Sequence, residues 1–147
     1  MKYWRPAKNL QRFCSVKCAV HVTGSQPTSP RAARAKAGIR LDIDPKIYFF
    51  SRWEANYARI LNLKKIKWIH QPQRFKLSTQ YYTPDFYLPK TGTYIEIKNF
   101  LAEYSQKRDQ DFRRLYPKEK LILILKVDYK KLEKKYAPII KEWEFSR

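Results

Sequence analysis

The apolar run at residues 121–127, LILILKV, limits the fold of this chain more than any other segment does. Lys126 is its one charged residue. Alternating Leu and Ile over this length are typical of a strand that is buried on both faces of a sheet. Such a strand needs cover on both sides, so the run predicts an α/β fold built in layers.

Segments with helical or extended periodicity surround this run. Helices are expected at 51–64, 102–116 and 129–143, the last interrupted at Pro138, and strands at 68–70, 74–77, 82–88 and 93–98. Ser51 and Glu54 have the spacing of a capping box, which marks the start of the first helix. A turn at 89–92 joins the last two strands as a hairpin. This order predicts a mixed central β-sheet flanked by helices.

The charge of the chain is far from balanced. Its 32 Lys and Arg residues against 13 Asp and Glu residues give a net charge of +19 and a pI near 10.0. Such self-repulsion opposes folding and is usually tolerated because a polyanion neutralises it. Nucleic acid is the expected partner, with ribosomal RNA or an anionic membrane surface as alternatives. No apolar run approaches the roughly 18 residues that a membrane-spanning helix needs, so no membrane partner is expected.

Residues 1–44 differ in composition from the rest of the chain. They hold both cysteines and a loop rich in Ser, Thr and Pro at 23–30. The Ala- and Arg-rich segment that follows predicts a short helix from Pro30 to Gly38 with a basic face. We therefore expect a basic DNA-binding arm without its own core at 1–44, extended or ordered on DNA, and a folded core at 45–147. The arm residues expected to bind nucleic acid are Arg31, Arg34, Lys36 and Arg40.

Cys14 and Cys18 are the only two cysteines of the chain. Two cysteines do not make a disulfide scaffold, so a reducing cytoplasm is the expected location. The segment resembles the second half of a zinc ribbon, and His21 lies at a suitable spacing for a third Zn²⁺ ligand. A structural zinc ion needs four ligands, so a relic knuckle or plain packing of small residues is the alternative. The acid-poor start also resembles a transit peptide, but it lacks an amphipathic period.

Charged residues interrupt two of the predicted strands. Glu96 and Lys98 are two apart in the strand at 93–98 and therefore project from one face. Asp85 lies on the neighbouring strand of the hairpin, within reach of Glu96 across the pair. Two close carboxylates repel unless a cation lies between them, and Mg²⁺ takes such oxygen ligands together with water and phosphate oxygens. Lys98 would then orient or deprotonate a water, or stabilise the charge of a phosphoryl transition state.

Asp85 after a proline, ten further residues, and then Glu96-Ile97-Lys98 resemble the signature of the PD-(D/E)XK, or restriction-endonuclease-like, nucleases. The resemblance implies that Asp85, Glu96 and the backbone carbonyl of Ile97 bind the metal and that Lys98 is the catalytic lysine. It also implies that Glu54 is a further catalytic and metal-binding residue, on the first core helix. The implied reaction is Mg²⁺-dependent hydrolysis of DNA to 5′-phosphate ends, with Mn²⁺ as a substitute. A phage or mobile-element endonuclease in a bacterial cytoplasm is the closest analogy.

The same residues have plainer explanations. Asp85 after a proline suits a turn, and Glu96 with Lys98 would make a surface ion pair worth about a few tenths of a kcal/mol. Glu54 is the N3 residue of the Ser51 capping box, although a cap does not prevent its carboxylate from approaching a metal. The nuclease interpretation therefore requires Asp85, Glu96 and Lys98 to meet at one place.

Basic and aromatic residues recur outside this motif. The helix expected at 102–116 carries Lys107, Arg108, Arg113 and Arg114, as DNA-phosphate contacts or as a solvated face, and Lys107 is also a candidate for an extra active-site base. Aromatic residues lie among or near Lys and Arg residues at 3–5, 74–76 and 81–82. Such rings suit stacking on unpaired nucleobases. Packing in the core or on an edge strand is the alternative for these rings.

These patterns together predict a metal-dependent DNA endonuclease. One site in one small chain would cut one strand, so a double-strand break would need a homodimer. A Holliday-junction resolvase with the same core is one alternative. A non-catalytic nucleic-acid-binding protein is the other, and it would share the charge but not depend on Asp85.

Overall fold

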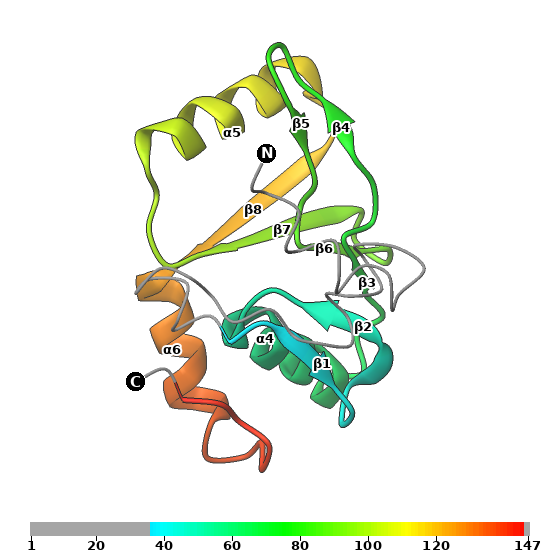
Figure 1. Ribbon diagram of the computed structural model, residues 1–147, viewed down its shortest axis with the longest axis vertical. Coiled ribbons are helices and arrows are strands. Elements are labelled where there is room, and N and C mark those ends of the chain that lie inside the picture. The colour runs from blue at the N-terminus through cyan, green and yellow to red at the C-terminus, as the bar shows by residue number, and fades with distance from the viewer. Residues whose placement is uncertain (1–35, 146–147) are drawn as a thin grey trace, which may run out of the picture. The chain divides into compact units, whose positions relative to one another are not determined.

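The computed structural model describes residues 36–145 and has an α/β architecture (Figure 1). Contacts between residues divide these positions into two compact units, one of residues 36–55 with 144–145 and one of residues 56–143. The predicted knuckle residues Cys14, Cys18 and His21 lie outside the described residues, as do Arg31 and Arg34.

The first unit is built on a two-stranded antiparallel sheet. Its strands are β1, Gly38–Arg40, and β2, Asp44–Phe49. The Arg40 guanidinium is buried and donates to the Glu144 carboxylate at 2.8 and 3.1 Å, as well as to two nearby backbone carbonyls. A buried guanidinium must be paired and hydrogen-bonded to offset its desolvation, and a two-bond Arg–carboxylate pair does this. The pair thereby joins the two chain segments of this unit.

Residues 36–44, which were expected to belong to an arm without a core, therefore have a defined structure. The helix predicted up to Gly38 falls mostly outside the described residues, and Gly38–Arg40 is a strand. This strand is held by the contact of Arg40 with Glu144, which lies 104 positions away and cannot be found from a local sequence pattern. The Arg40 contacts are structural, and Lys36 approaches the same Glu144 carboxylate at 3.9 Å. Binding of nucleic acid by Lys36 and Arg40 stays a prediction.

Helix α4, Arg52–Leu63, confirms the helix expected at 51–64 and runs from the first unit into the second. The Ser51 hydroxyl accepts from the Glu54 backbone N–H at 3.1 Å. In return the Glu54 carboxylate accepts from the Ser51 hydroxyl at 3.1 Å and from the Phe50 N–H at 3.2 Å. These reciprocal bonds satisfy donors that the start of a helix leaves unpaired, so the predicted cap is confirmed.

The second unit contains a four-stranded sheet in the order β3-β6-β7-β8. Its strands are β3, Ile69–His70; β6, Phe86–Leu88; β7, Thr93–Lys98; and β8, Lys120–Leu125. The first three are antiparallel neighbours, and β7 and β8 are parallel, so the predicted mixed sheet is confirmed. The run expected at 82–88 is split, because Pro84 has no N–H to donate to a strand ladder.

One face of this sheet packs against a hairpin and a helix. Strands β4, Phe75–Lys76, and β5, Tyr81–Tyr82, form the hairpin, and α5, Glu103–Leu115, lies beside it on the same side of β7 and β8 (Figure 1). The core here is largely aromatic, with three rings packed edge to face around Phe75. Its buried members are Phe75, Leu77, Tyr82, Tyr94, Phe112 and Leu121.

The opposite face is centred on Phe86, which is fully buried. The rings of Tyr57 on α4, Trp68 and His70 lie 5.4, 5.5 and 5.4 Å from it, all edge to face. Helix α6, Lys126–Tyr136, follows β8 and adds Tyr129, whose hydroxyl accepts from a buried amide of α4 at 2.8 Å. Helices therefore lie on both faces of the sheet, as the sequence predicted.

Strand β8 differs from its prediction in two respects. It is an edge strand among the described residues, paired with β7 alone. Leu121 and Ile124, on opposite faces, are buried as expected, but Ile122 is 41% exposed, so the burial on both faces is only partial. The strand also ends at Leu125 rather than at 127, because a helix cap competes for the backbone. The Asp128 carboxylate accepts from the Leu125 N–H at 3.3 Å and starts α6 there.

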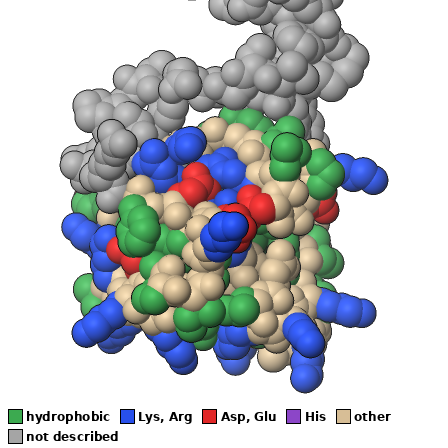
Figure 2. All heavy atoms as spheres, turned by 90° about the horizontal axis from the view of Figure 1, so that it is seen from below, with side chains coloured by type: hydrophobic (Ala, Val, Ile, Leu, Met, Phe, Trp, Pro, Cys, Tyr) green, Lys and Arg blue, Asp and Glu red, His purple; other side chains and the backbone are tan. Residues whose placement is uncertain are grey.

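Basic side chains are prominent on the face drawn in Figure 2. Lys and Arg side chains lie at its margin and also in its upper part and centre, while acidic side chains are fewer and lie mainly beside basic ones. Within residues 36–145, no helix combines the length and the apolar character that crossing a membrane requires.

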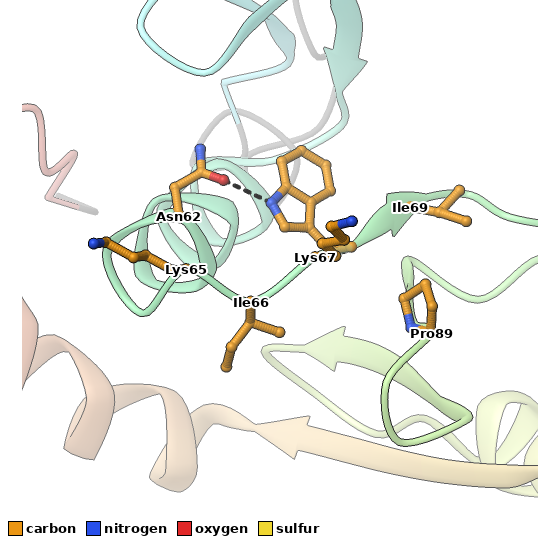
Figure 3. Close-up of a pocket in the computed structure, with 7 residues that line it drawn as sticks. Asn62, Lys65, Ile66, Lys67, Ile69 and Pro89 are labelled. Carbon is orange, nitrogen blue, oxygen red and sulfur yellow. Dashed lines mark hydrogen bonds between the residues drawn. The ribbon is translucent and has the colours of Figure 1, made fainter.

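The C-terminal end of α4 forms a Schellman motif without glycine. The Ile66 N–H donates to Leu61 O at 2.9 Å and the Lys65 N–H to Asn62 O at 3.0 Å. Lys65 adopts a φ of 55°, the left-handed region that disfavours side chains with a Cβ. Figure 3 shows this turn beside an open pocket, with the Trp68 indole donating to the Asn62 side chain at 2.8 Å.

Replacing Lys65 by glycine should stabilise the protein. The left-handed conformation costs a side-chain-bearing residue roughly 1–2 kcal/mol, and the greater backbone entropy of unfolded glycine offsets about half of that. We expect Lys65→Gly to raise the free energy of unfolding by about 0.5–1 kcal/mol in urea titrations. Lys65→Ala is the matched control, since it removes the charge and keeps the Cβ; an equal gain in both variants would contradict the conformational explanation.

Candidate active site

Glu96 and Lys98 lie on the same face of β7, as their spacing predicted. The Lys98 Nζ is 3.1 Å from Glu96 Oε1, and the Glu96 side chain is only 6% exposed. Ile95, between Tyr94 and Glu96, points to the Phe86 side of the sheet, where it is buried. Glu96 is therefore a carboxylate inside a packed layer and not a surface residue, which removes the explanation as an exposed ion pair.

Asp85 is held against this strand by a backbone hydrogen bond. Its Oδ2 accepts from the Ile97 N–H at 2.7 Å, and that amide lies between Glu96 and Lys98 in the chain. The register pairs Phe86 with Ile95, so the next cross-strand position puts Asp85 opposite Glu96. The structure thus brings Asp85, Glu96 and Lys98 together.

Two further side chains complete the surroundings of Glu96. The Tyr82 hydroxyl on β5 donates to Glu96 Oε2 at 3.1 Å, and the Arg108 Nη2 on α5 donates to Glu96 Oε1 at 3.1 Å. The Arg108 guanidinium also lies over the Tyr82 ring, with Cζ 4.1 Å from the centroid. Strand β7, hairpin β4–β5 and helix α5 therefore each contribute a group to one carboxylate.

The surroundings of Tyr82 and Arg108 raise the pKa of both groups. Burial, followed by the negative charges of Glu96, Asp109 and Asp85, raises the pKa of the Tyr82 hydroxyl far above its ordinary value, although Arg108 acts in the opposite direction. Burial also opposes the charge of Arg108, but the carboxylates of Glu96 and Asp109 outweigh it and raise the pKa of the guanidinium. Tyr82 is thus a hydrogen-bond donor and Arg108 a permanent cation throughout the physiological range.

Asp109 is a second buried carboxylate at this place, beside Glu96. Its Oδ1 accepts from Arg108 at 2.7 and 3.0 Å, while its Oδ2 is buried without a hydrogen-bond partner among the described residues. Asp85, Glu96 and Asp109 thus place three carboxylates near the cations Lys98 and Arg108. An unsatisfied buried carboxylate oxygen is costly unless a further positive charge compensates it.

The donor chemistry of the site fits a hard divalent cation. Carboxylate oxygens with water and phosphate oxygens are the shell that Mg²⁺ prefers, and it commonly uses only one or two protein carboxylates. Within residues 36–145 no group of three His, Cys, Asp or Glu side chains is arranged to hold a metal ion. Metal binding by Asp85, Glu96 and the Ile97 carbonyl therefore stays a prediction.

The other predicted site residues have separate positions. Glu54 belongs to the first unit, where its carboxylate forms the cap described above, and its metal-binding role stays a prediction. Lys107 is 73% exposed and pairs with Glu103 at 2.7 Å, so it does not approach Glu96 and no observation supports it as an extra base. Arg113 donates to a backbone carbonyl of β8 at 2.9 Å. Arg114, 65% exposed, pairs with Asp111 on the same helix.

Sequence reasoning missed two members of this site, Tyr82 and Asp109, and the place of Arg108 within it. Asp109 had a detectable signal, because it lies at helical spacing from Ser105 and Phe112, the other buried residues of α5. A charged residue on the core-facing stripe of a helix is unusual and points to a specific partner. Tyr82 had no such signal, since a buried tyrosine is ordinary in a strand.

No protein-family model matches the chain, and a comparison with curated proteins found no similar sequence. Membership of the PD-(D/E)XK superfamily therefore stays a proposal. It depends on the motif and on the geometry described above.

Tyr82→Phe should destabilise the protein at pH 7 and change its alkaline unfolding. Loss of a hydrogen bond to a charged, buried partner costs roughly 1.5–3 kcal/mol. A tyrosine whose folded pKa is raised adds stability that is fully present below its unfolded pKa of about 10 and is lost as the pH rises toward the folded value. The wild type should therefore lose stability above pH 10 by up to about 1.4 kcal/mol per pH unit for this residue, and the variant should lack that contribution.

Urea titrations across this pH range measure both effects. Tyr57, buried against Phe86 and with a pKa that burial raises to about 12, contributes a second alkaline loss that persists in the variant. Exposed Tyr81→Phe is the control at pH 7 and should leave stability unchanged. A Tyr82→Phe variant as stable as wild type at pH 7 would show that the hydroxyl does not support Glu96.

Proposed function

We propose that this chain is a Mg²⁺-dependent DNA endonuclease of the PD-(D/E)XK type, with a restriction-endonuclease-like core. One observation carries the proposal: Asp85 is hydrogen-bonded to the Ile97 amide while Lys98 pairs with buried Glu96. Supporting it, the motif lies on an antiparallel pair of strands, followed by a helix and a parallel strand. The charge of +19 supports a polyanionic substrate.

In this proposal Asp85, Glu96 and the Ile97 carbonyl hold the metal ion. When bound, the ion polarises the scissile phosphate and lowers the pKa of a coordinated water. Lys98 orients that water through its ammonium N–H groups and stabilises negative charge as it develops on the phosphate. Its contact with Glu96 at 3.1 Å fixes the ammonium at the carboxylate, so little reorganisation is needed during the reaction.

Arg108 has two roles in this scheme. Without the metal ion it neutralises Glu96 and Asp109, two carboxylates whose side chains are each 6% exposed. With a phosphate at the site, its remaining N–H groups are suited to the non-bridging oxygens, because the planar guanidinium matches phosphate geometry. Tyr82 beneath it limits the movement of the guanidinium plane.

Exposed basic side chains of α5 would hold the DNA backbone beside the site. Lys107 and Arg114 are 73% and 65% exposed, and phosphate contacts need only this accessibility and charge. A single site cuts a single strand, so the expected product of one protomer is a nick. Cleavage of both strands would require a homodimer.

Mg²⁺ should stabilise the folded protein even without DNA. A ligand that binds only the native state at ten times its Kd adds about 1.4 kcal/mol, which corresponds to a rise in Tm of roughly 3–6 °C. Thermal unfolding with and without Mg²⁺ should show this rise in wild type and lose it in Asp85→Ala. Glu142→Ala, an exposed acidic control in the same unit, should keep the rise; an equal rise in all three proteins would contradict the assigned ligands.

Plasmid relaxation in the presence of Mg²⁺ tests the reaction itself. We expect wild type to nick supercoiled plasmid and Asp85→Ala and Lys98→Ala to be slower by about 10²-fold or more, the usual cost of removing a catalytic group. Glu142→Ala and Lys141→Ala are the matched exposed controls, and circular dichroism checks that all variants fold.

The possible outcomes separate the competing functions. Nicking that persists unchanged in both Asp85→Ala and Lys98→Ala would remove this site from the mechanism. Tight DNA binding by wild type without any cutting would favour a non-catalytic binding protein. Cutting of four-way junctions far faster than linear duplex would favour a resolvase.

A further inference from the structure

The β4–β5 hairpin has two chemically different faces. Phe75 and Tyr82 point inward and are 5% and 3% exposed, in the core above the sheet. Side chains alternate along a strand, so Arg74, Lys76 and Tyr81 belong to the outer face, and all three are exposed. Lys76 and Tyr81 are direct cross-strand partners, which makes this face one contiguous strip of two cations and an aromatic ring.

Tyr81 already forms a stacked arrangement on this strip. Its side chain is 54% exposed, and the Arg74 guanidinium lies over its ring with Cζ 4.0 Å from the centroid. The ring contributes little to the core, because Tyr82 fills the inward position of the same strand. An exposed tyrosine ring can stack on a nucleobase, and guanidinium and ammonium groups beside it can neutralise the phosphates of the nucleic-acid backbone.

A second exposed ring continues the strip toward the candidate active site. Tyr104, 62% exposed in the first turn of α5, donates its hydroxyl hydrogen bond to the side chain of Gln80, the residue before Tyr81. Tyr104 is four positions before Arg108, so the two share one helix face and lie about one turn apart. Arg108 bonds Glu96, and the strip therefore ends beside the carboxylate that anchors the site.

We propose that this strip, Arg74, Lys76, Tyr81 and Tyr104, binds unpaired nucleobases by stacking, and that the substrate is DNA with a single-stranded segment beside the cleaved strand. The choice of DNA rests on the proposed nuclease function. Paired bases in a duplex present edges and not faces, so two exposed rings beside a phosphate-cleaving site suit an unstacked strand better than intact duplex.

Binding without metal tests the strip independently of catalysis. Full-length protein in EDTA is titrated into a fluorescent oligothymidylate and into a duplex of equal length. We expect Tyr81→Ala and Tyr104→Ala each to weaken single-strand binding by about fivefold or more, the loss that corresponds to one base–aromatic stack, with duplex binding unchanged. Tyr81→Phe and Tyr104→Phe keep the ring and should retain wild-type binding.

Ile139→Ala, which truncates a side chain that is 63% exposed on another part of the same unit, is the control and should change neither affinity. A 2-aminopurine placed in the single strand should be quenched on binding wild type and the Phe variants, and less so on binding the Ala variants. Equal losses for both substrates, or none for the single strand, would overturn the proposal.

The two proposals fail separately. If nicking depends on Asp85 but the rings do not contribute to single-strand binding, the proposed single-stranded substrate is wrong and the nuclease proposal is supported. If single-strand binding depends on the rings but no DNA is cleaved, the nuclease proposal is wrong and the strip is supported as a nucleic-acid-binding site.

Discussion

Glu96 carries a negative charge inside a layer of aromatic and aliphatic side chains, and much of the second unit is arranged around that charge. A buried carboxylate is stable only when it is paired and hydrogen-bonded. Lys98 comes from its own strand, Tyr82 from the hairpin above and Arg108 from α5. The three elements that pack the core on this face are therefore the same elements that compensate the charge, so the candidate site and the core share one framework.

One buried carboxylate beside Glu96 is not fully hydrogen-bonded. Asp109 leaves one buried oxygen without a hydrogen-bond partner among the described residues. Natural proteins tolerate local defects of this kind mainly where function requires them. In the proposed nuclease a divalent cation would compete with Arg108 for Glu96, so metal binding would be coupled to release of the guanidinium toward a phosphate.

Alternation along short strands separates folding from recognition in this unit. On β5, Tyr82 packs inward while Tyr81 faces solvent, and on β7 the isoleucines face α4 while Glu96 and Lys98 face α5. Each strand thus contributes packing side chains on one face and charged or exposed aromatic side chains on the other. Because the outer face of the hairpin carries little of the packing, its charges and rings are available for a ligand without loss of the fold.

Sequence alone determined the features that depend on local spacing. Period-two alternation put Glu96 and Lys98 on one face, the Ser51 cap and the turn at 89–92 fixed where α4 and the hairpin form, and the element order gave a mixed sheet. Tertiary structure decided which distant groups meet: Arg108 and not Lys107 reaches Glu96, Asp109 joins it, and Arg40 finds Glu144. It also left Ile122 on β8 exposed. Local patterns specify which way a side chain points, whereas its partner is set by how separate elements pack, and that information lies outside any single segment.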